Sequence, residues 1–161
     1  MALAQENAKA RDVADTLAEL KARKIADRNP TALVLGCDQV LAVGEEIWSK
    51  PDTQTDARHQ LRTLSGGTHH LHSALVLYHN AQPIWRHVGS ARLTMRTLSE
   101  DYIDDYLNRN WPAVSYSVGA YQIEEEGIRL FTDIEGDYFT VLGLPLLPLL
   151  AYLTLREFIA S

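Results

Sequence analysis

The chain has 161 residues, of which 46% are hydrophobic and 22% charged, and its formal net charge at pH 7 is −6. This length suits a single domain with a buried core, and the composition excludes a disordered or fibrous chain. The negative charge disfavours general binding to nucleic acid, and the single cysteine, Cys37, excludes an internal disulfide and favours a reducing, cytoplasmic location.

The N-terminal quarter predicts a helix followed by a strand. Residues 2–26 have apolar positions at helical spacing with charges of both signs between them, which predicts an amphipathic helix and no export signal. Asn29 and Pro30 end this helix, because the residue before a proline is pushed out of the helical region. The apolar run at residues 32–36 then predicts a buried strand, which residues 39–43 continue.

A loop and a second helix follow this strand. A turn at residues 44–46 leads into a short returning strand, and this ends at a Ser-Lys-Pro sequence that places Lys50 on a loop. Residues 55–64 carry apolar side chains at spacings of three and four, which predicts a second helix. The Ser-Gly-Gly sequence at residues 65–67 is a suitable end for it.

The middle of the chain predicts a hairpin and a third helix. Residues 69–79 and 84–95 are rich in strand-forming side chains and are separated by a turn, so we expect the two segments to pair. Ser99 is a suitable N-cap for a helix over residues 100–108, whose acidic residues lie near its positive end.

The C-terminal third predicts two extended segments and a closing helix. Residues 118–123 and 128–134 are the extended segments, and a buried helix is expected from Leu144 onward. The apolar run at residues 141–155 is interrupted by glycine and proline, so it is too short and too broken to cross a membrane. This order of elements predicts an α/β fold with a mixed central sheet and flanking helices, in one domain over residues 1–161.

Three charged residues are candidates for chemistry. Asp38 follows an apolar strand, where ligands bind in α/β folds, although a carboxylate there also commonly hydrogen-bonds a turn. Lys50 lies on a loop that could hold its ammonium against a phosphate, and a solvated lysine is the alternative. Lys21 flanks the apolar face of the first helix, where Arg23 and Lys24 compete for any role in a site.

Two further groups are weaker candidates. Tyr121 and Glu124 follow a glycine and could accommodate a base, or they could be a core tyrosine and a turn glutamate. His69, His70 and His72 have spacing that could suit a metal, but only two of them share a strand face, so a polar strand face is the preferred interpretation. The chain has no Walker loop, no dinucleotide fingerprint and no nucleophile elbow.

Several short motifs occur in order along nearly the whole chain. They are LAELKA at residues 17–22, LGCDQV at 35–40, KP at 50–51, LSG at 64–66 with His69, GAY at 119–121, and IEG at 134–136 followed by GLPL at 143–146. Together they resemble the Maf family of nucleoside triphosphate pyrophosphatases. The resemblance implies a Maf/ITPase-like fold and a metal-dependent enzyme that releases a nucleoside monophosphate and pyrophosphate.

The resemblance also implies roles for individual residues. Asp38 matches the family's catalytic aspartate, which accepts a proton from the attacking water, and Lys21 and Lys50 match lysines that neutralise phosphate charge. Substrate contacts are expected from three residues, which are Ser65, Tyr121 and Glu124. A divalent cation, Mg²⁺, Mn²⁺ or Co²⁺, is expected with Asp38 and Glu135 as its ligands.

Position 124 bears on the choice of base. Many family members have glutamine where this chain has Glu124, and glutamate there is similar to the branch that acts on 7-methyl-GTP. A carboxylate accepts hydrogen bonds and attracts a cationic methylated guanine, whereas thymine or uracil offers it one ring N–H. Trp85 and Trp111 are candidates for stacking on the base.

Some family features are absent from the sequence. The family begins with a strand, a Ser-x-Ser-Pro-Arg-Arg loop that holds phosphates, and an Asp-Glu pair, and we expect this chain to lack all three. Thr140 also replaces a usual asparagine. The alternatives to an active enzyme are therefore a nucleotide-binding protein without turnover and a regulatory module. An unpaired sheet edge would favour a homodimer, and no nucleic acid or membrane partner is expected.

Overall fold

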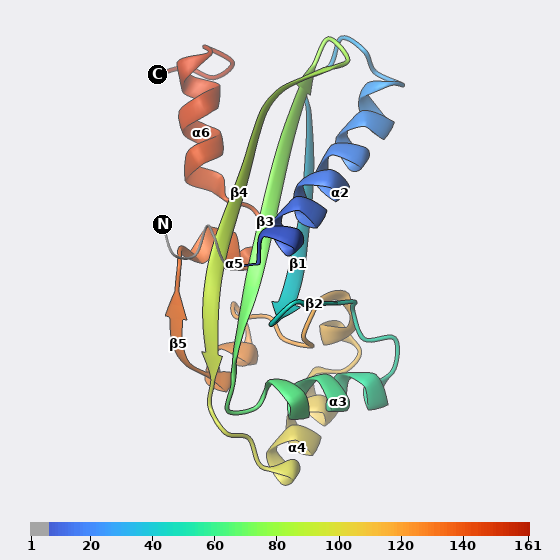
Figure 1. Cartoon of the computed structure of the whole chain (residues 1–161), viewed down its shortest axis with the longest axis vertical. Helices are drawn as coiled ribbons and strands as arrows, with labels where there is room; N and C mark the ends of the chain where they lie inside the picture. The colour runs from blue at the N-terminus through green and yellow to red at the C-terminus, as the bar shows by residue number, and fades with distance from the viewer. Residues whose placement is uncertain (1–6) are drawn as a thin grey trace.

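The computed structural model describes residues 7–161, which form an α/β fold on one central sheet (Figure 1). The sheet has five strands in the order β2-β1-β3-β4-β5. The strands are β1 (Val34–Val43), β2 (Glu46–Trp48), β3 (Thr68–His79), β4 (Gln82–Met95) and β5 (Phe131–Glu135). Each pair of neighbouring strands is antiparallel. Figure 1 shows that β3 and β4 form a long hairpin that extends along most of the molecule.

Helices flank this sheet. They are α2 (Ala8–Ala26), α3 (Gln54–Leu64), α4 (Glu100–Asn110), α5 (Tyr138–Leu142) and α6 (Leu146–Leu155), with two 3-10 turns, η1 (Ala113–Tyr116) and η2 (Glu126–Leu130). In Figure 1, α2 crosses β1 and β3, α3 and α4 lie together at one end of the strands, and α6 lies beside β4. None of the helices in the described part of the chain is long and apolar enough to span a membrane.

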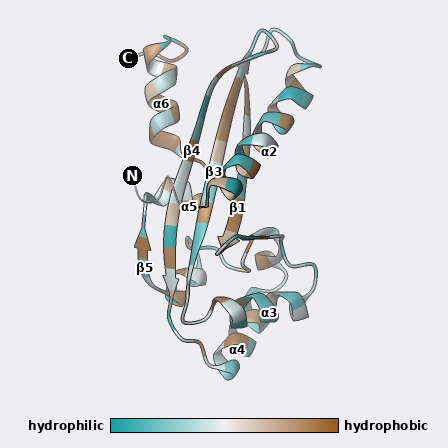
Figure 2. Ribbon diagram, viewed as in Figure 1, coloured by the Kyte–Doolittle hydropathy of each residue, from teal (hydrophilic) through white to brown (hydrophobic). Residues whose placement is uncertain are grey.

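The packing of α2 on β1 depends on small residues. Its buried side chains are all alanines at a spacing of four, namely Ala10, Ala14, Ala18, Ala22 and Ala26. A Cβ atom at Gly36 of β1 would lie 2.1 Å from the Ala18 carbonyl oxygen, so only glycine fits at this contact. The helix backbone therefore lies unusually close to the strand. The hydropathy colours alternate along α2 (Figure 2), as expected for a helix packed on one side.

A second core lies around α3, α4 and the lower half of the hairpin. Its largest fully buried side chains include Leu61, Leu93, Tyr106 and Leu107. The start of α3 is fixed by a capping box in which Thr53 and Asp56 exchange side-chain and backbone hydrogen bonds, both at 3.1 Å. This core also holds the loop before η2, because Tyr121 belongs to it.

The prediction of an α/β fold with a central sheet and flanking helices is confirmed. Within residues 7–161 every strand pair is antiparallel, where both parallel and antiparallel pairs were expected. The first helix begins at Ala8, and residues 2–6 of the predicted helix lie outside the described residues. β1 is one continuous strand, so Asp38 lies within it and not beyond its end.

Two predictions near the C-terminus are wrong. Residues 118–123 form a loop and not a strand, because Gly119 and Ala120 have left-handed backbone conformations, with φ of 83° and 61°. The closing helix expected from Leu144 onward is present as α6, but it is only partly buried, and the separate helix α5 before Gly143 was not predicted. Leu147 is 62% exposed there, and Leu149 is the one buried residue of that helix.

Candidate active site

Asp38 forms an ion pair with Lys21 on the α2 face of the sheet. The Lys21 ammonium contacts the Asp38 carboxylate and also donates to the Cys37 carbonyl oxygen at 3.2 Å. The Asp38 side chain is only 13% exposed, whereas that of Lys21 is 59% exposed. The close packing of α2 on Gly36 brings the two charges together, because Gly36 and Asp38 lie on the same face of β1.

The edge of β1 beside Asp38 is open within the described residues. β2 pairs only with the last part of β1, at Leu41, Ala42 and Val43. β3 pairs with the other edge along nearly its whole length. A ligand can therefore approach Asp38 along the strand edge, where no neighbouring strand blocks it in residues 7–161.

Two adjoining hollows surround this position. The first, here called the main pocket, has a cavity volume of about 240 Å³ and is lined by Lys21, Cys37, Asp38, Gln39, Lys50, Tyr116, Ser117, Val118, Leu142 and Gly143. The second, the side pocket, has a volume of about 50 Å³ and includes Tyr121 and Glu124 among its lining residues. Four residues line both hollows, namely Gln39, Ser117, Val118 and Leu142. The two hollows are therefore neighbours that share a wall.

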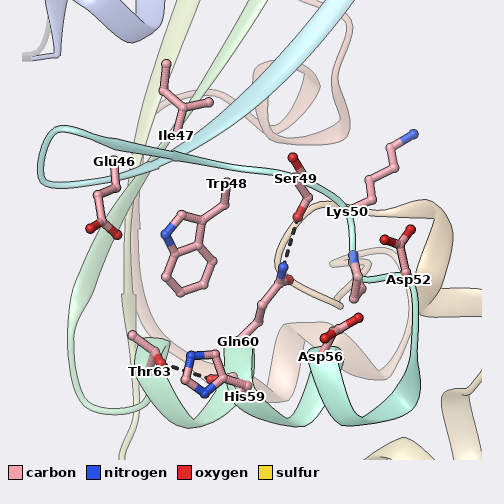
Figure 3. A pocket seen from close by; sticks show the side chains of 11 residues that line it. Glu46, Ile47, Trp48, Ser49, Lys50, Asp52, Asp56, His59, Gln60 and Thr63 are labelled. Carbon is pink, nitrogen blue, oxygen red and sulfur yellow. Dashed lines mark hydrogen bonds between the residues drawn. The ribbon is translucent and has the colours of Figure 1, made fainter.

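Lys50 reaches the main pocket from the loop between β2 and α3. Gln60 of α3 donates its side-chain N–H to the Ser49 carbonyl oxygen at 2.9 Å, which ties this loop to the helix. Figure 3 shows Gln60 and Trp48 on one side of the loop and the Lys50 ammonium pointing away from them. They line a separate groove of about 510 Å³, the Trp48 groove, which shares Lys50 with the main pocket.

Gln39 holds the opposite wall of the main pocket. Its side-chain N–H group lies 3.0 Å from the Val141 carbonyl oxygen, 3.2 Å from that of Thr140 and 3.0 Å from the Ser73 hydroxyl oxygen. The Cys37 thiol donates to the Gly143 carbonyl oxygen at 2.9 Å. These bonds fix the end of α5 against β1. Burial raises the pKa of the Cys37 thiol, which disfavours a nucleophilic thiolate.

Two buried hydrogen bonds hold the loop that carries Glu124. The Tyr106 hydroxyl donates to the Ala120 carbonyl oxygen at 2.9 Å, and the Tyr121 hydroxyl shares a 2.8 Å hydrogen bond with His69 Nε2. Burial lowers the pKa of His69 to about 4, so this imidazole is neutral at pH 7. Tyr121 is itself only 5% exposed. It therefore supports the loop and has little surface to offer a ligand.

Comparison with known proteins finds a family match over nearly the whole chain. The family model described as Maf-like protein matches residues 2–156.

The chain belongs to the Maf family.

Among its relatives is a nucleoside triphosphate pyrophosphatase of Ruegeria pomeroyi, 55% identical over 155 residues, which are 96% of this chain and 78% of the relative. A 7-methyl-GTP pyrophosphatase of Brucella abortus is 50% identical over 151 residues, 94% of this chain and 76% of the relative. One of Mesorhizobium japonicum with the same name is 55% identical over 142 residues, 88% of this chain and 71% of the relative.

In this Maf chain five predicted site residues line the two hollows. The main pocket contains Lys21, Asp38 and Lys50, and the side pocket contains Tyr121 and Glu124. Ser65 and Glu135 line neither hollow. The Ser65 hydroxyl oxygen accepts from the Leu98 backbone N–H at 2.7 Å and so holds the end of α3. Glu135 pairs with Arg92 at 3.3 Å on β5. Their positions do not support direct roles in the site.

The predicted histidine face is present but holds no metal-binding group. The rings of His70 and His72 stack with centroids 6.0 Å apart, whereas His69 points to the other side, to Tyr121. No group of three or more metal-ligating side chains occurs among the described residues. In the main pocket Asp38 is the one carboxylate.

Several lining residues were missed by sequence reasoning. Gln39 adjoins Asp38 in the sequence, but its role depends on carbonyl oxygens about a hundred positions away. Tyr116 precedes the Glu124 loop and carried no motif. Leu142 and Gly143 line the main pocket because the end of α5 lies against β1. In the sequence, only the glycine of the motif at residues 143–146 indicated this region.

Proposed function

We propose that this Maf chain is a nucleoside triphosphate pyrophosphatase, which hydrolyses its substrate to the nucleoside monophosphate and pyrophosphate. The observation that carries the proposal is the convergence of Asp38, Lys21 and Lys50 on one hollow from three separate elements. Relatives that are 50% to 55% identical are named as pyrophosphatases of nucleotides. A binding protein without turnover, the alternative from the sequence, is less well supported by these names.

Each charged residue has a task in this reaction. Water attacks the α-phosphorus, the bond from that phosphorus to the bridging oxygen breaks, and pyrophosphate leaves with the bond's electrons. Asp38 accepts a proton from the attacking water, and the Lys21 ammonium in contact with it holds the carboxylate in place. Lys21 and Lys50 neutralise the charge that develops on the phosphate oxygens.

The main pocket offers a divalent cation one carboxylate ligand, Asp38. Mg²⁺ typically takes one or two carboxylates and completes its shell with substrate phosphates and water. Asp38 can supply the one carboxylate, and Glu135 is directed to Arg92 instead. When bound, such a cation supplies positive charge to the triphosphate.

Glu124 is proposed to select the base. It lines the side pocket, which shares four lining residues with the main pocket. A carboxylate at this position accepts hydrogen bonds from a guanine edge and attracts the positive charge that 7-methylation adds. We therefore propose 7-methyl-GTP as a preferred substrate, as the names of several relatives indicate for those proteins.

Replacement of Asp38 tests the reaction. Asp38→Asn should lower the rate of pyrophosphate release by roughly 100-fold or more, because a general base contributes ~10²–10⁴-fold. Nucleotide binding measured without a divalent cation should change little. The matched control is Asp52→Asn, since Asp52 lines the Trp48 groove and not the main pocket. Equal rates for Asp38→Asn and the wild type would remove Asp38 from the mechanism. No pyrophosphate release by the wild type from any triphosphate would reject the function.

Replacement of Glu124 tests the choice of base. Glu124→Gln should lower the ratio of kcat/KM for 7-methyl-GTP to that for UTP, because it removes the negative charge that faces the cationic ring. Glu125→Gln is the control, because Glu125 follows Glu124 but lines neither hollow. An unchanged ratio in Glu124→Gln would show that this carboxylate does not set the preference.

Other expectations from the sequence stay predictions. A cytoplasmic location rests on the single cysteine, and a homodimer rests on the open edge of β1 in the described residues. The expectation of no nucleic acid partner rests on the net charge of −6, and that of no membrane partner rests on the interrupted apolar run at residues 141–155.

A further inference from the structure

We propose that Tyr116 is the stacking platform for the substrate base and that it favours a positively charged, 7-methylated guanine. The proposal rests on the pyrophosphatase function above and adds a residue that determines specificity. The first observation is the high solvent exposure of the Tyr116 side chain. Tyr116 is 75% exposed at the end of η1, whereas tyrosine is a residue of intermediate burial in folded proteins.

The exposed ring borders the site. Tyr116 lines the main pocket together with Asp38, Lys21 and Lys50, so it lies beside the residues that face the phosphates. The next two residues, 117 and 118, line both the main pocket and the side pocket that holds Glu124. A base that hydrogen-bonds to Glu124 while its phosphates contact the lysines must therefore pass this segment of the chain.

Other aromatic candidates lie elsewhere. Trp85 stacks on Tyr152, with centroids 5.2 Å apart, and Trp111 ends α4 and packs against the core. Neither of them lines the main or the side pocket. Trp48 lines the groove on the other side of the Lys50 loop. Among residues 7–161, Tyr116 is therefore the one aromatic side chain of the two hollows whose ring is exposed.

The backbone on both sides of Tyr116 is held by hydrogen bonds. Ser115 N–H donates to the Pro112 carbonyl oxygen at 2.9 Å, and Ser117 N–H donates to that of Val114 at 3.2 Å. Val114 is buried in the core. No other ring stacks on Tyr116 in the described part of the chain, so one face of it is available.

The chemistry of the pair explains the preference for charge. A phenol ring attracts a cation over its face, and 7-methylation makes guanine cationic while it leaves the ring flat for stacking. Glu124 supplies a full negative charge at the edge of the same base. Tyr116 and Glu124 together would thus recognise the face and the edge of a cationic purine. A neutral purine would gain the stacking but lose the attraction to charge.

Binding of the reaction products tests this proposal without turnover. Titration calorimetry measures Kd for 7-methyl-GMP and for GMP with the wild type, Tyr116→Ala, Tyr116→Phe and Tyr138→Ala. Tyr116→Ala should weaken 7-methyl-GMP by roughly 10-fold and GMP by only about 3-fold, because loss of the ring removes both stacking and the cation contact. Tyr116→Phe keeps a ring and should bind like the wild type. Tyr138 is also exposed, at 52%, and lies outside both hollows, so Tyr138→Ala should change neither Kd.

Three results would overturn the proposal. They are an unchanged Kd for 7-methyl-GMP in Tyr116→Ala with a wild-type circular dichroism spectrum, an equal loss for both nucleotides, and no binding of either nucleotide to the wild type at millimolar concentration. Pyrophosphate release by the wild type is measured separately. Release without discrimination by Tyr116 would reject this inference alone, and discrimination without release would reject the proposed function alone.

Discussion

Replacement of Gln39 should both destabilise the fold and loosen the main pocket. Gln39→Met keeps the length of the side chain but removes the N–H group that bonds to Thr140 and Val141. The Thr140 carbonyl oxygen keeps a second donor, the Ser73 hydroxyl at 2.7 Å. The Val141 carbonyl oxygen loses its side-chain donor, and Val141 is buried. The substitution therefore leaves one buried acceptor unpaired.

One such group costs ~1–3 kcal/mol. For a protein of this size 1 kcal/mol lowers Tm by ~2–4 °C, so a cost of about 2 kcal/mol, in the middle of that range, should make Gln39→Met melt roughly 4–8 °C below the wild type. The end of α5 should also move more freely, which raises KM for the triphosphate, because Leu142 and Gly143 line the main pocket.

Thermal unfolding followed by circular dichroism at pH 7, with pyrophosphate release at 25 °C, checks both effects. Gln54→Met is the control, since Gln54 lies exposed in the first turn of α3, and its Tm should stay within about 1 °C of the wild type, as surface substitutions rarely exceed ~0.5 kcal/mol. A Gln39→Met protein with the Tm and KM of the wild type would show that this amide does not hold the wall of the pocket.

Two further predictions follow from the described contacts. Burial lowers the pKa of His69 to about 4, below its unfolded value near 6.5, so the unfolded chain binds more protons than the folded chain between these pH values. The free energy of unfolding should therefore decrease as the pH is lowered from 6.5 to 4, by ~3 kcal/mol over the whole interval. Urea titrations at pH 7 and 4.5 should therefore show a smaller loss for His69→Gln than for the wild type or for the exposed control His59→Gln, and equal losses would contradict burial as the cause. Gln60→Ala should raise KM for the triphosphate by roughly 2- to 10-fold, because it removes a hydrogen bond worth ~0.5–1.5 kcal/mol from the loop that carries Lys50. Thr63→Ala is the control, because Thr63 lines the Trp48 groove but bonds to His59 and not to the Lys50 loop. An equal rise of KM in both variants would show that the hydrogen bond from Gln60 to Ser49 does not position Lys50.

The sequence was most informative where function depends on local pattern. Lys21 was chosen by family resemblance among three neighbouring basic residues, and the structure places it against Asp38. The helix at residues 100–108 was predicted from its N-cap, and Ser99 does accept from the Tyr102 backbone N–H at 3.1 Å. Helix caps and short motifs act within a few residues, so they can be recognised without knowledge of the fold.

The errors arose where distant segments decide the outcome. Residues 118–123 have the composition of a strand, but Tyr106 binds the Ala120 carbonyl oxygen and the backbone turns into left-handed conformations instead. The apolar composition of α6 predicted burial, yet composition cannot tell whether another element covers a helix. Gln39 belongs to the motif at residues 35–40, but its hydrogen bonds could not be predicted, because its partners lie near the other end of the chain.

The contact between α2 and β1 has a consequence for how the reactive charges are spaced. The position of Lys21 relative to Asp38 is set by methyl groups and by one glycine, none of which would touch a substrate. A single added carbon at Ala18, Ala22 or Gly36 would act as a wedge and lift the ammonium from the carboxylate. These small residues therefore set the distance between the two charges of the proposed catalytic pair, and we expect substitutions among relatives to be as restricted there as at the charges themselves.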